Sequence, residues 1–190
     1  MRDIKYGLNP VEFPPIAAHR AGVQAYDQAG LDFLTYWDQH ALTIPRSLWT
    51  PDLAPAAEMF HIDSWLEPWP LLTDAAIHTN TIRLGLSASD VTRRPPSILA
   101  QLALTLDHYA EGRFFLALGA GEAKQSLPYG LSRDKPFGRL EETLKLLRLW
   151  FDTNEPIDYD GTFWKVKNGG VSTPAFTPGG PELLVAGGPG

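Results

Sequence analysis

The residues best suited to chemistry follow an apolar stretch that begins after Arg113, at residues 114–118. This stretch runs into the turn Gly119-Ala120-Gly121 and then into Glu122. A short, continuous apolar run is typical of a strand buried on both faces. Because the turn has almost no side-chain bulk, a flat ligand or a phosphate group could lie against its backbone, at the strand end where parallel α/β folds place their sites. Glu122 would then stand at the pocket mouth. The alternative is an ordinary strand-to-helix turn with a solvated glutamate.

Other reactive groups have less favourable spacing. Four histidines show neither an i, i+4 pairing nor an H-E-x-x-H pattern: His19, His61, His78 and His108. We therefore expect no metal site. Ser47 and Ser87 lack the G-x-S-x-G elbow, which argues against an esterase.

The composition is that of a soluble globular protein, with 44% hydrophobic and 20% charged residues among 190. The net charge is -6 and no basic cluster offsets it, so nucleic acid and anionic membranes are not expected partners. The chain has no cysteine, which fits a reducing compartment, and its first residues lack the apolar run of a signal peptide. We expect a cytoplasmic protein.

Strand-like and helix-like segments alternate along the chain. Strands are predicted at residues 4–9, 33–37, 83–89, 113–118 and 182–186, and helices at residues 15–29, 68–79, 96–109 and 136–150. In the third helix, six residues at helical spacing predict one buried face: Ile98, Leu99, Leu102, Ala103, Leu106 and Tyr109. A small hairpin is predicted to turn at Tyr159-Asp160-Gly161-Thr162.

A long irregular segment, residues 38–67, separates the second strand from the second helix. Loops of this length in compact domains are usually lids or binding loops. Four tryptophans crowd around this segment: Trp37, Trp49, Trp65 and Trp69. Their rings could line an apolar substrate pocket or form a small core of the segment itself, and we favour the second role for Trp65 and Trp69.

This β/α alternation predicts an α/β fold of parallel, neighbouring strands joined by right-handed crossovers. A TIM (β/α)8 barrel takes about 250 residues, and this chain stops directly after its fifth predicted strand. We therefore expect residues 1–190 to be the N-terminal part of one barrel domain. An open doubly wound sheet is the alternative, although its last strand would lack a helix and no G-x-G-x-x-G follows the first strand.

Five segments, in their order along the chain, resemble the luciferase-like superfamily: Tyr36-Trp37-Asp38-Gln39-His40, Gly85-Leu86-Ser87, Gly119-Ala120-Gly121-Glu122-Ala123, Asp160-Gly161-Thr162-Phe163-Trp164 and Val185-Ala186-Gly187-Gly188-Pro189. Two further segments resemble its coenzyme F420-dependent reductases, especially the phthiodiolone ketoreductase type: Ile44-Pro45-Arg46-Ser47 and Glu67-Pro68-Trp69. The resemblance implies a barrel that binds F420 or, alternatively, FMN.

The resemblance also implies catalytic roles. Asp38 matches an aspartate that binds the ring system of the cofactor, and Glu122 matches an acid that faces the active centre. Gln39 occupies the position where the family usually has histidine, and His40 comes one residue later. Glutamine could orient a carbonyl by donating a hydrogen bond but cannot exchange a proton at neutral pH, whereas imidazole can. His40 is thus the first candidate for the proton donor, and a loop histidine without chemistry is the alternative.

The remaining implied residues would hold the cofactor. Ser87-Ala88 matches a site where the peptide bond is cis without proline and forms a bulge behind the cofactor ring. Gly121, in the turn that lacks side-chain bulk, is also expected to contact the cofactor. Three further elements match positions that hold the ribityl and phosphate parts: Thr92, Gln125 and the turn Ala186-Gly187-Gly188. Backbone N–H groups at such turns suit a phosphate.

These features predict an oxidoreductase that transfers a hydride between reduced F420 and a carbonyl or related organic substrate. An FMN-dependent monooxygenase and a non-catalytic barrel subunit are the alternatives. We expect an apolar small-molecule substrate and, for the full-length protein, a homodimer.

Overall fold

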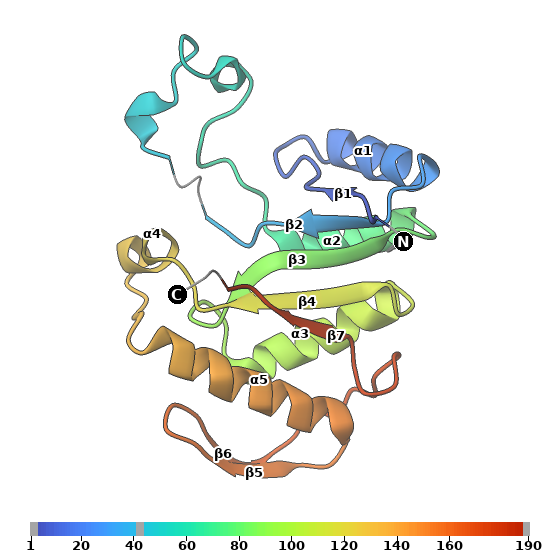
Figure 1. The fold of residues 1–190 in the computed structure, drawn as a ribbon, viewed down its shortest axis with the longest axis vertical. Helices are drawn as coiled ribbons and strands as arrows, with labels where there is room; N and C mark the ends of the chain where they lie inside the picture. Colours follow the sequence, from blue (N-terminus) through green and yellow to red (C-terminus); the bar gives the residue numbers. More distant parts are fainter. Residues whose placement is uncertain (1–3, 41–43, 188–190) are drawn as a thin grey trace.

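Five parallel strands form the central sheet of the computed structural model, which describes residues 4–40 and 44–187 (Figure 1). The strands are β1 (Gly7–Leu8), β2 (Phe33–Tyr36), β3 (Arg83–Asp90), β4 (Phe114–Gly119) and β7 (Glu182–Val185). Their spatial order, β1-β2-β3-β4-β7, follows the order along the chain without reversal. A doubly wound sheet would reverse its order at a switch point, so this order is that of a barrel segment.

Helices cover one face of this sheet (Figure 1). They are α1 (Ile16–Gln28), α2 (Pro68–His78), α3 (Pro96–Tyr109) and α5 (Pro136–Asp152). Proline opens three of them at a position where its missing N–H costs no hydrogen bond, and Gly30 follows α1 with a φ of +76°. The predicted strands and helices are confirmed, with ends shifted by a few residues.

The largest shift is at β1, predicted over residues 4–9 and observed over two residues. Among the described strands β1 pairs only with β2, through Gly7 and Leu8. Residues outside this register have no strand partner there, so the strand ends early.

The core lies between the sheet and these helices. The side chains that alternate toward the helices are fully buried, among them Leu34, Leu84, Leu116 and Leu118. Toward the opposite face of the sheet, a Cβ on Gly85 would collide with the Phe115 ring. Glycine at this position therefore lets the ring lie flat against the sheet.

The predicted buried face of α3 is only partly correct. Leu99, Ala103 and Leu106 are buried, whereas Ile98 and Tyr109 are 44% and 50% exposed. The helix lies on β4 with α2 and α5 on either side. Its buried arc therefore turns toward its neighbours and includes two residues that the prediction omitted, Ala100 and Leu104.

The described part of the 38–67 segment contains only two short 3-10 helices, η1 (Arg46–Leu48) and η2 (Pro55–Glu58). Aromatic rings pack around it: Phe13 stacks on Phe60 at 3.8 Å and lies 4.5 Å from Trp65. The prediction for Trp69 is wrong. Trp69 belongs to α2, is 5% exposed and packs against Phe114 in the main core.

Three smaller features complete the fold. The predicted hairpin forms from β5 (Ile157–Asp160) and β6 (Lys165–Gly169), beside α5. A short helix α4 (Ala123–Ser126) and a 3-10 turn η3 (Leu127–Tyr129) follow β4 and were not predicted. Within the described ranges, no helix is both long and apolar enough to cross a membrane.

Candidate functional site

A cavity of about 530 Å³ opens at the carboxyl ends of the strands. Its lining comes from four strand ends, residues 37–39 after β2, 87–90 of β3, 119–122 at the end of β4 and 186–187 after β7. Three further residues complete it: Gln125 of α4, Arg133 of the connection that follows, and Phe137 of α5. Figure 1 shows that the connections after β2, β4 and β7 all lie at this one end of the sheet. The cavity is therefore at the edge where parallel barrels place their sites.

Most of the predicted site residues meet in this cavity: Asp38, Gln39, Ser87, Ala88, Gly121, Glu122, Gln125, Ala186 and Gly187. Glu122 is exposed, as expected for a residue at the mouth. His40 and Thr92 lie beside the cavity and not among its lining residues. Gly188 lies outside the described residues.

Small residues from β3, β4 and β7 form one wall. The peptide bond between Ser87 and Ala88 is cis, as predicted, and the register of β3 against β4 shifts between Leu86 and Ser89. Gly121 has a φ of +80°, and a Cβ there would lie 3.1 Å from the Cβ of Asp90. Glycine is thus required at this turn by both backbone conformation and space.

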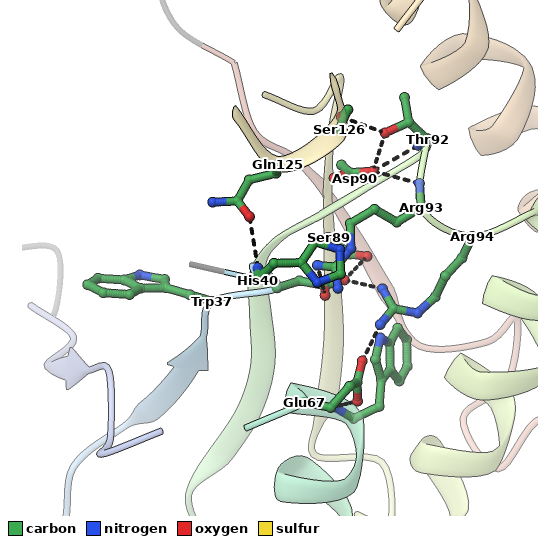
Figure 2. A network of polar contacts seen from close by, with 12 residues as sticks. Trp37, His40, Glu67, Ser89, Asp90, Thr92, Arg93, Arg94, Gln125 and Ser126 are labelled. Atoms are coloured by element: carbon green, nitrogen blue, oxygen red, sulfur yellow. Dashed lines mark hydrogen bonds and ion pairs between the residues drawn. The ribbon is translucent and has the colours of Figure 1, made fainter. Parts of the chain in front are cut away.

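Asp38 is the centre of a buried charge network next to the cavity. Its carboxylate accepts hydrogen bonds from Ser89 Oγ at 2.5 Å, from Arg93 Nη1 at 2.5 Å and from Arg94 Nη1. None of its side chain is exposed. Figure 2 shows Arg93 and Arg94 approaching from the loop after β3. Two guanidinium groups therefore balance this buried charge from within the protein.

Arg94 also joins the two ends of the 38–67 segment. One terminal nitrogen pairs with Asp38, and the other pairs with Glu67 (Figure 2). The guanidinium also lies 5.7 Å from the centre of the Trp69 ring. Glu12 also accepts hydrogen bonds from residues near both ends of the 38–67 segment. Its Oε1 accepts from Trp37 N at 2.9 Å, and its carbonyl oxygen accepts from Leu66 N at 2.9 Å. The segment is thus anchored at both ends to the barrel.

The Glu12 side chain is a buried carboxylic acid. It is 1% exposed, and its Oε2 has no hydrogen-bond partner among the described residues. Burial is the main cause that raises the pKa of Glu12 to about 8, and the negative charge of Asp38 adds to the rise. The hydrogen bond from the Trp37 N–H lowers this pKa, but by less than burial raises it. At neutral pH the group therefore carries its proton in the folded state.

This shift predicts a pH-dependent stability. Between its ordinary pKa near 4.5 and the folded value of about 8, the folded state holds a proton that the unfolded state has lost. The contribution of Glu12 to the free energy of unfolding is fully present below about pH 4.5 and is lost as pH rises through 8. The free energy of unfolding should fall over this range by at most about 1.4 kcal/mol per pH unit. We expect Glu12→Gln, which mimics the protonated form, to remove this slope in urea unfolding at pH 5 to 8.5.

The control is Glu155→Gln on an exposed turn, which should leave the profile unchanged. An unaltered slope in Glu12→Gln would show that Glu12 ionises normally in the folded protein.

Gln39 and His40 differ in how they meet the cavity. Gln39 lines it, and its buried Nε2 has no hydrogen-bond partner among the residues that the structure describes. The His40 ring instead lies 4.1 Å from the Tyr129 ring, and its backbone N–H donates to Gln125 Oε1 at 2.8 Å (Figure 2). Burial and then the Arg93 charge lower the pKa of His40, partly offset by Asp38 and Asp90. Its imidazole is therefore mainly neutral at neutral pH.

Asp90, which the sequence analysis missed, lines the cavity and shapes its wall. Its Oδ1 accepts from Thr92 N at 2.8 Å, from Thr92 Oγ1 at 2.7 Å and from Arg93 N at 2.8 Å. Thr92 thus holds the loop after β3 against this carboxylate. The Asp-x-Thr spacing of such a turn was the available sequence signal.

Comparison with known proteins gives the family. The sequence matches the luciferase-like monooxygenase family over residues 4–189. It is 34% identical over 179 residues to the phthiodiolone/phenolphthiodiolone dimycocerosates ketoreductase of Mycobacterium bovis (strain BCG / Pasteur 1173P2), covering 91% of this chain and 46% of that protein. It is 32% identical over 169 residues to the F420-dependent glucose-6-phosphate dehydrogenase of Mycobacterium avium (strain 104), covering 76% and 48%. The chain thus spans about half the length of these curated relatives.

The fold has a close counterpart in a solved F420-dependent secondary alcohol dehydrogenase in complex with an F420-acetone adduct. The TM-score is 0.73 at 21% identity, covering 97% of this chain and 53% of that one. This likeness concerns the fold alone, and it agrees with a sheet that is part of a larger barrel. The family match covers nearly the whole chain, so the chain belongs to the luciferase-like monooxygenase family.

Proposed function

We propose that this protein is an oxidoreductase that uses reduced coenzyme F420 to reduce a carbonyl or related organic substrate. The observation that carries the proposal is the cavity itself: it has a wall of small residues at the strand ends, and Gln39 lines it with a buried amide nitrogen that has no hydrogen-bond partner among the described residues. The relatives named as a ketoreductase and as an F420-dependent dehydrogenase support the same chemistry.

The cavity fits a flat cofactor in two respects. Its volume of about 530 Å³ is in the range of small-molecule sites. Ala88 and Gly121 leave the backbone accessible on one wall, where larger side chains would fill the space. When bound, the deazaflavin would supply the hydride, so the protein must supply orientation, exclusion of water and a proton.

The residues divide this work in our proposal. Gln39 donates a hydrogen bond from Nε2 to the substrate oxygen, and His40, next to it, provides the proton. Glu122, at the mouth, is the alternative proton donor. Asp38 holds the first residues after β2 in place through Arg93 and Arg94.

The substrate is proposed to be apolar. Trp37 lines the cavity and is 38% exposed, and its ring lies 5.3 Å from that of Trp65. Trp65 in turn contacts Phe13, so an aromatic surface extends from the cavity toward the 38–67 segment. Such a surface favours a substrate with hydrocarbon groups.

Cofactor choice is the direct test. We expect the full-length protein to bind reduced F420 at least about tenfold more tightly than FMN, a difference of about 1.4 kcal/mol. Fluorescence titration of both cofactors under the same buffer measures this ratio. Equal or reversed affinities would favour the FMN-dependent monooxygenase, and binding of neither would favour a non-catalytic barrel subunit.

A further inference from the structure

The connection between η3 and α5 brings one arginine to the cavity. Arg133 lines it and, of the described lining residues, is the only basic one. We propose that Arg133 binds the phosphoryl group on the ribityl arm of the cofactor. The inference rests on the proposed function and assigns to it a residue that neither sequence pattern nor strand position indicated.

The guanidinium is held in place by the turn that forms the cavity wall. Arg133 Nε donates a hydrogen bond to the Gly121 carbonyl oxygen at 2.8 Å. Within the described part of the chain, its two terminal nitrogens make no hydrogen bond or ion pair that would occupy them. Arg133 thus differs from Arg93 and Arg94, whose terminal nitrogens are engaged by Asp38 and Glu67. An anchored guanidinium with unoccupied N–H groups suits a bidentate oxyanion.

The charged groups along the cavity differ in how they are paired. Asp38 is balanced by two arginines, and Asp90 Oδ1 accepts three hydrogen bonds from its own loop. Glu122 makes no ion pair with Arg133. Asp90 and Glu122 keep their negative charges, so Arg133 is the one basic side chain among the described lining residues that a phosphoryl group could contact.

There is also room for such a group beside the strand end. A Cβ on Gly119 would lie 3.7 Å from the Ala186 Cβ, so the β4 turn and the end of β7 are neighbours. A Cβ on Gly187 would have no heavy atom within 4 Å. The space between Gly187 and the Arg133-bound turn is therefore open to a ligand.

The test compares ligands that differ only in their anionic groups. F420, its glutamate-free form and the phosphate-free deazariboflavin are titrated by fluorescence against full-length wild type, Arg133→Gln and Arg139→Gln. Arg139 is the matched control because its Nε also donates to a backbone carbonyl, that of Asp134 at 2.9 Å, but it does not line the cavity.

We expect Arg133→Gln to weaken both phosphorylated ligands about tenfold or more and to leave the deazariboflavin affinity within about twofold. The salt dependence of F420 binding should become shallower in this variant only, since one charge contact is lost. Arg139→Gln should match wild type throughout, and circular dichroism should show the same fold in all three proteins.

Other results would overturn the proposal. Equal weakening of all three ligands would indicate a disturbed cavity wall, and no weakening would remove Arg133 from the site. Weakening of the glutamate-bearing form alone would assign Arg133 to the tail carboxylates. In each of these cases wild type still binds deazaflavin, so the proposed function stands. If wild type binds none of the ligands, both fail together.

Discussion

Asp38→Asn is expected to destabilise the fold by about 3–5 kcal/mol, the usual cost of leaving buried charge without its partner. The carboxylate is fully buried, and the Arg93 and Arg94 side chains are only 8% and 14% exposed. Without the negative charge, two partly desolvated guanidinium groups would face each other next to the cavity. Denaturant unfolding at neutral pH measures the loss.

Two variants make this result specific. Glu141→Gln breaks the exposed ion pair with Lys145 in α5 and should cost at most about 0.5 kcal/mol. The double variant Asp38→Asn/Arg94→Gln should cost less than the sum of its single changes by about 1 kcal/mol or more, because one stranded charge is gone. Additive costs, or a cost for Asp38→Asn no larger than for Glu141→Gln, would contradict the network.

His40→Ala is expected to lower the turnover number for carbonyl reduction by roughly a hundredfold or more, in the range of a lost general acid, with cofactor affinity nearly unchanged. The active form would be the protonated imidazole. Because burial and Arg93 lower the pKa of His40 below its usual 6.5, turnover should fall as pH rises through a value below 6.5. Steady-state kinetics from pH 5 to 9 should show this limb in wild type and not in His40→Ala.

The control is His61→Ala, which removes a histidine of the same segment whose side chain is 70% exposed and which lies outside the cavity. It should retain wild-type turnover. If Gln39→Ala loses turnover and His40→Ala does not, the proton comes from another group, and Glu122 is then the next candidate.

Local sequence pattern was enough to locate the elements and the edge of the sheet that carries the site. The helix predicted at residues 96–109 is α3, Pro96–Tyr109, because helical spacing and an opening proline are local signals. The strand at residues 113–118 and its glycine turn were likewise visible, and parallel strands share one direction. Asp38, Ser87 and Gly121, each near a strand end, therefore meet at one edge.

Residue type and resemblance also identified most of the cavity wall, since its positions tolerate little side-chain bulk. The bulge at Ser87-Ala88 is an example, confirmed by the cis bond and the shifted register. By contrast, the arc of α3 that is buried depends on which helices lie beside it, and Ile98 and Tyr109 were misplaced for that reason.

Only the tertiary structure decided how the charges are paired. Asp38 meets Arg93 and Arg94 across separations of 55 and 56 positions, and nothing in the local pattern links them. The raised pKa of Glu12 depends on its burial, and the position of Arg133 depends on its hydrogen bond to the carbonyl of Gly121. Periodicity indicates which face of an element is buried. The partner of a charged group depends instead on which loops meet at the strand ends, and that is determined by the packing of the whole sheet and its helices.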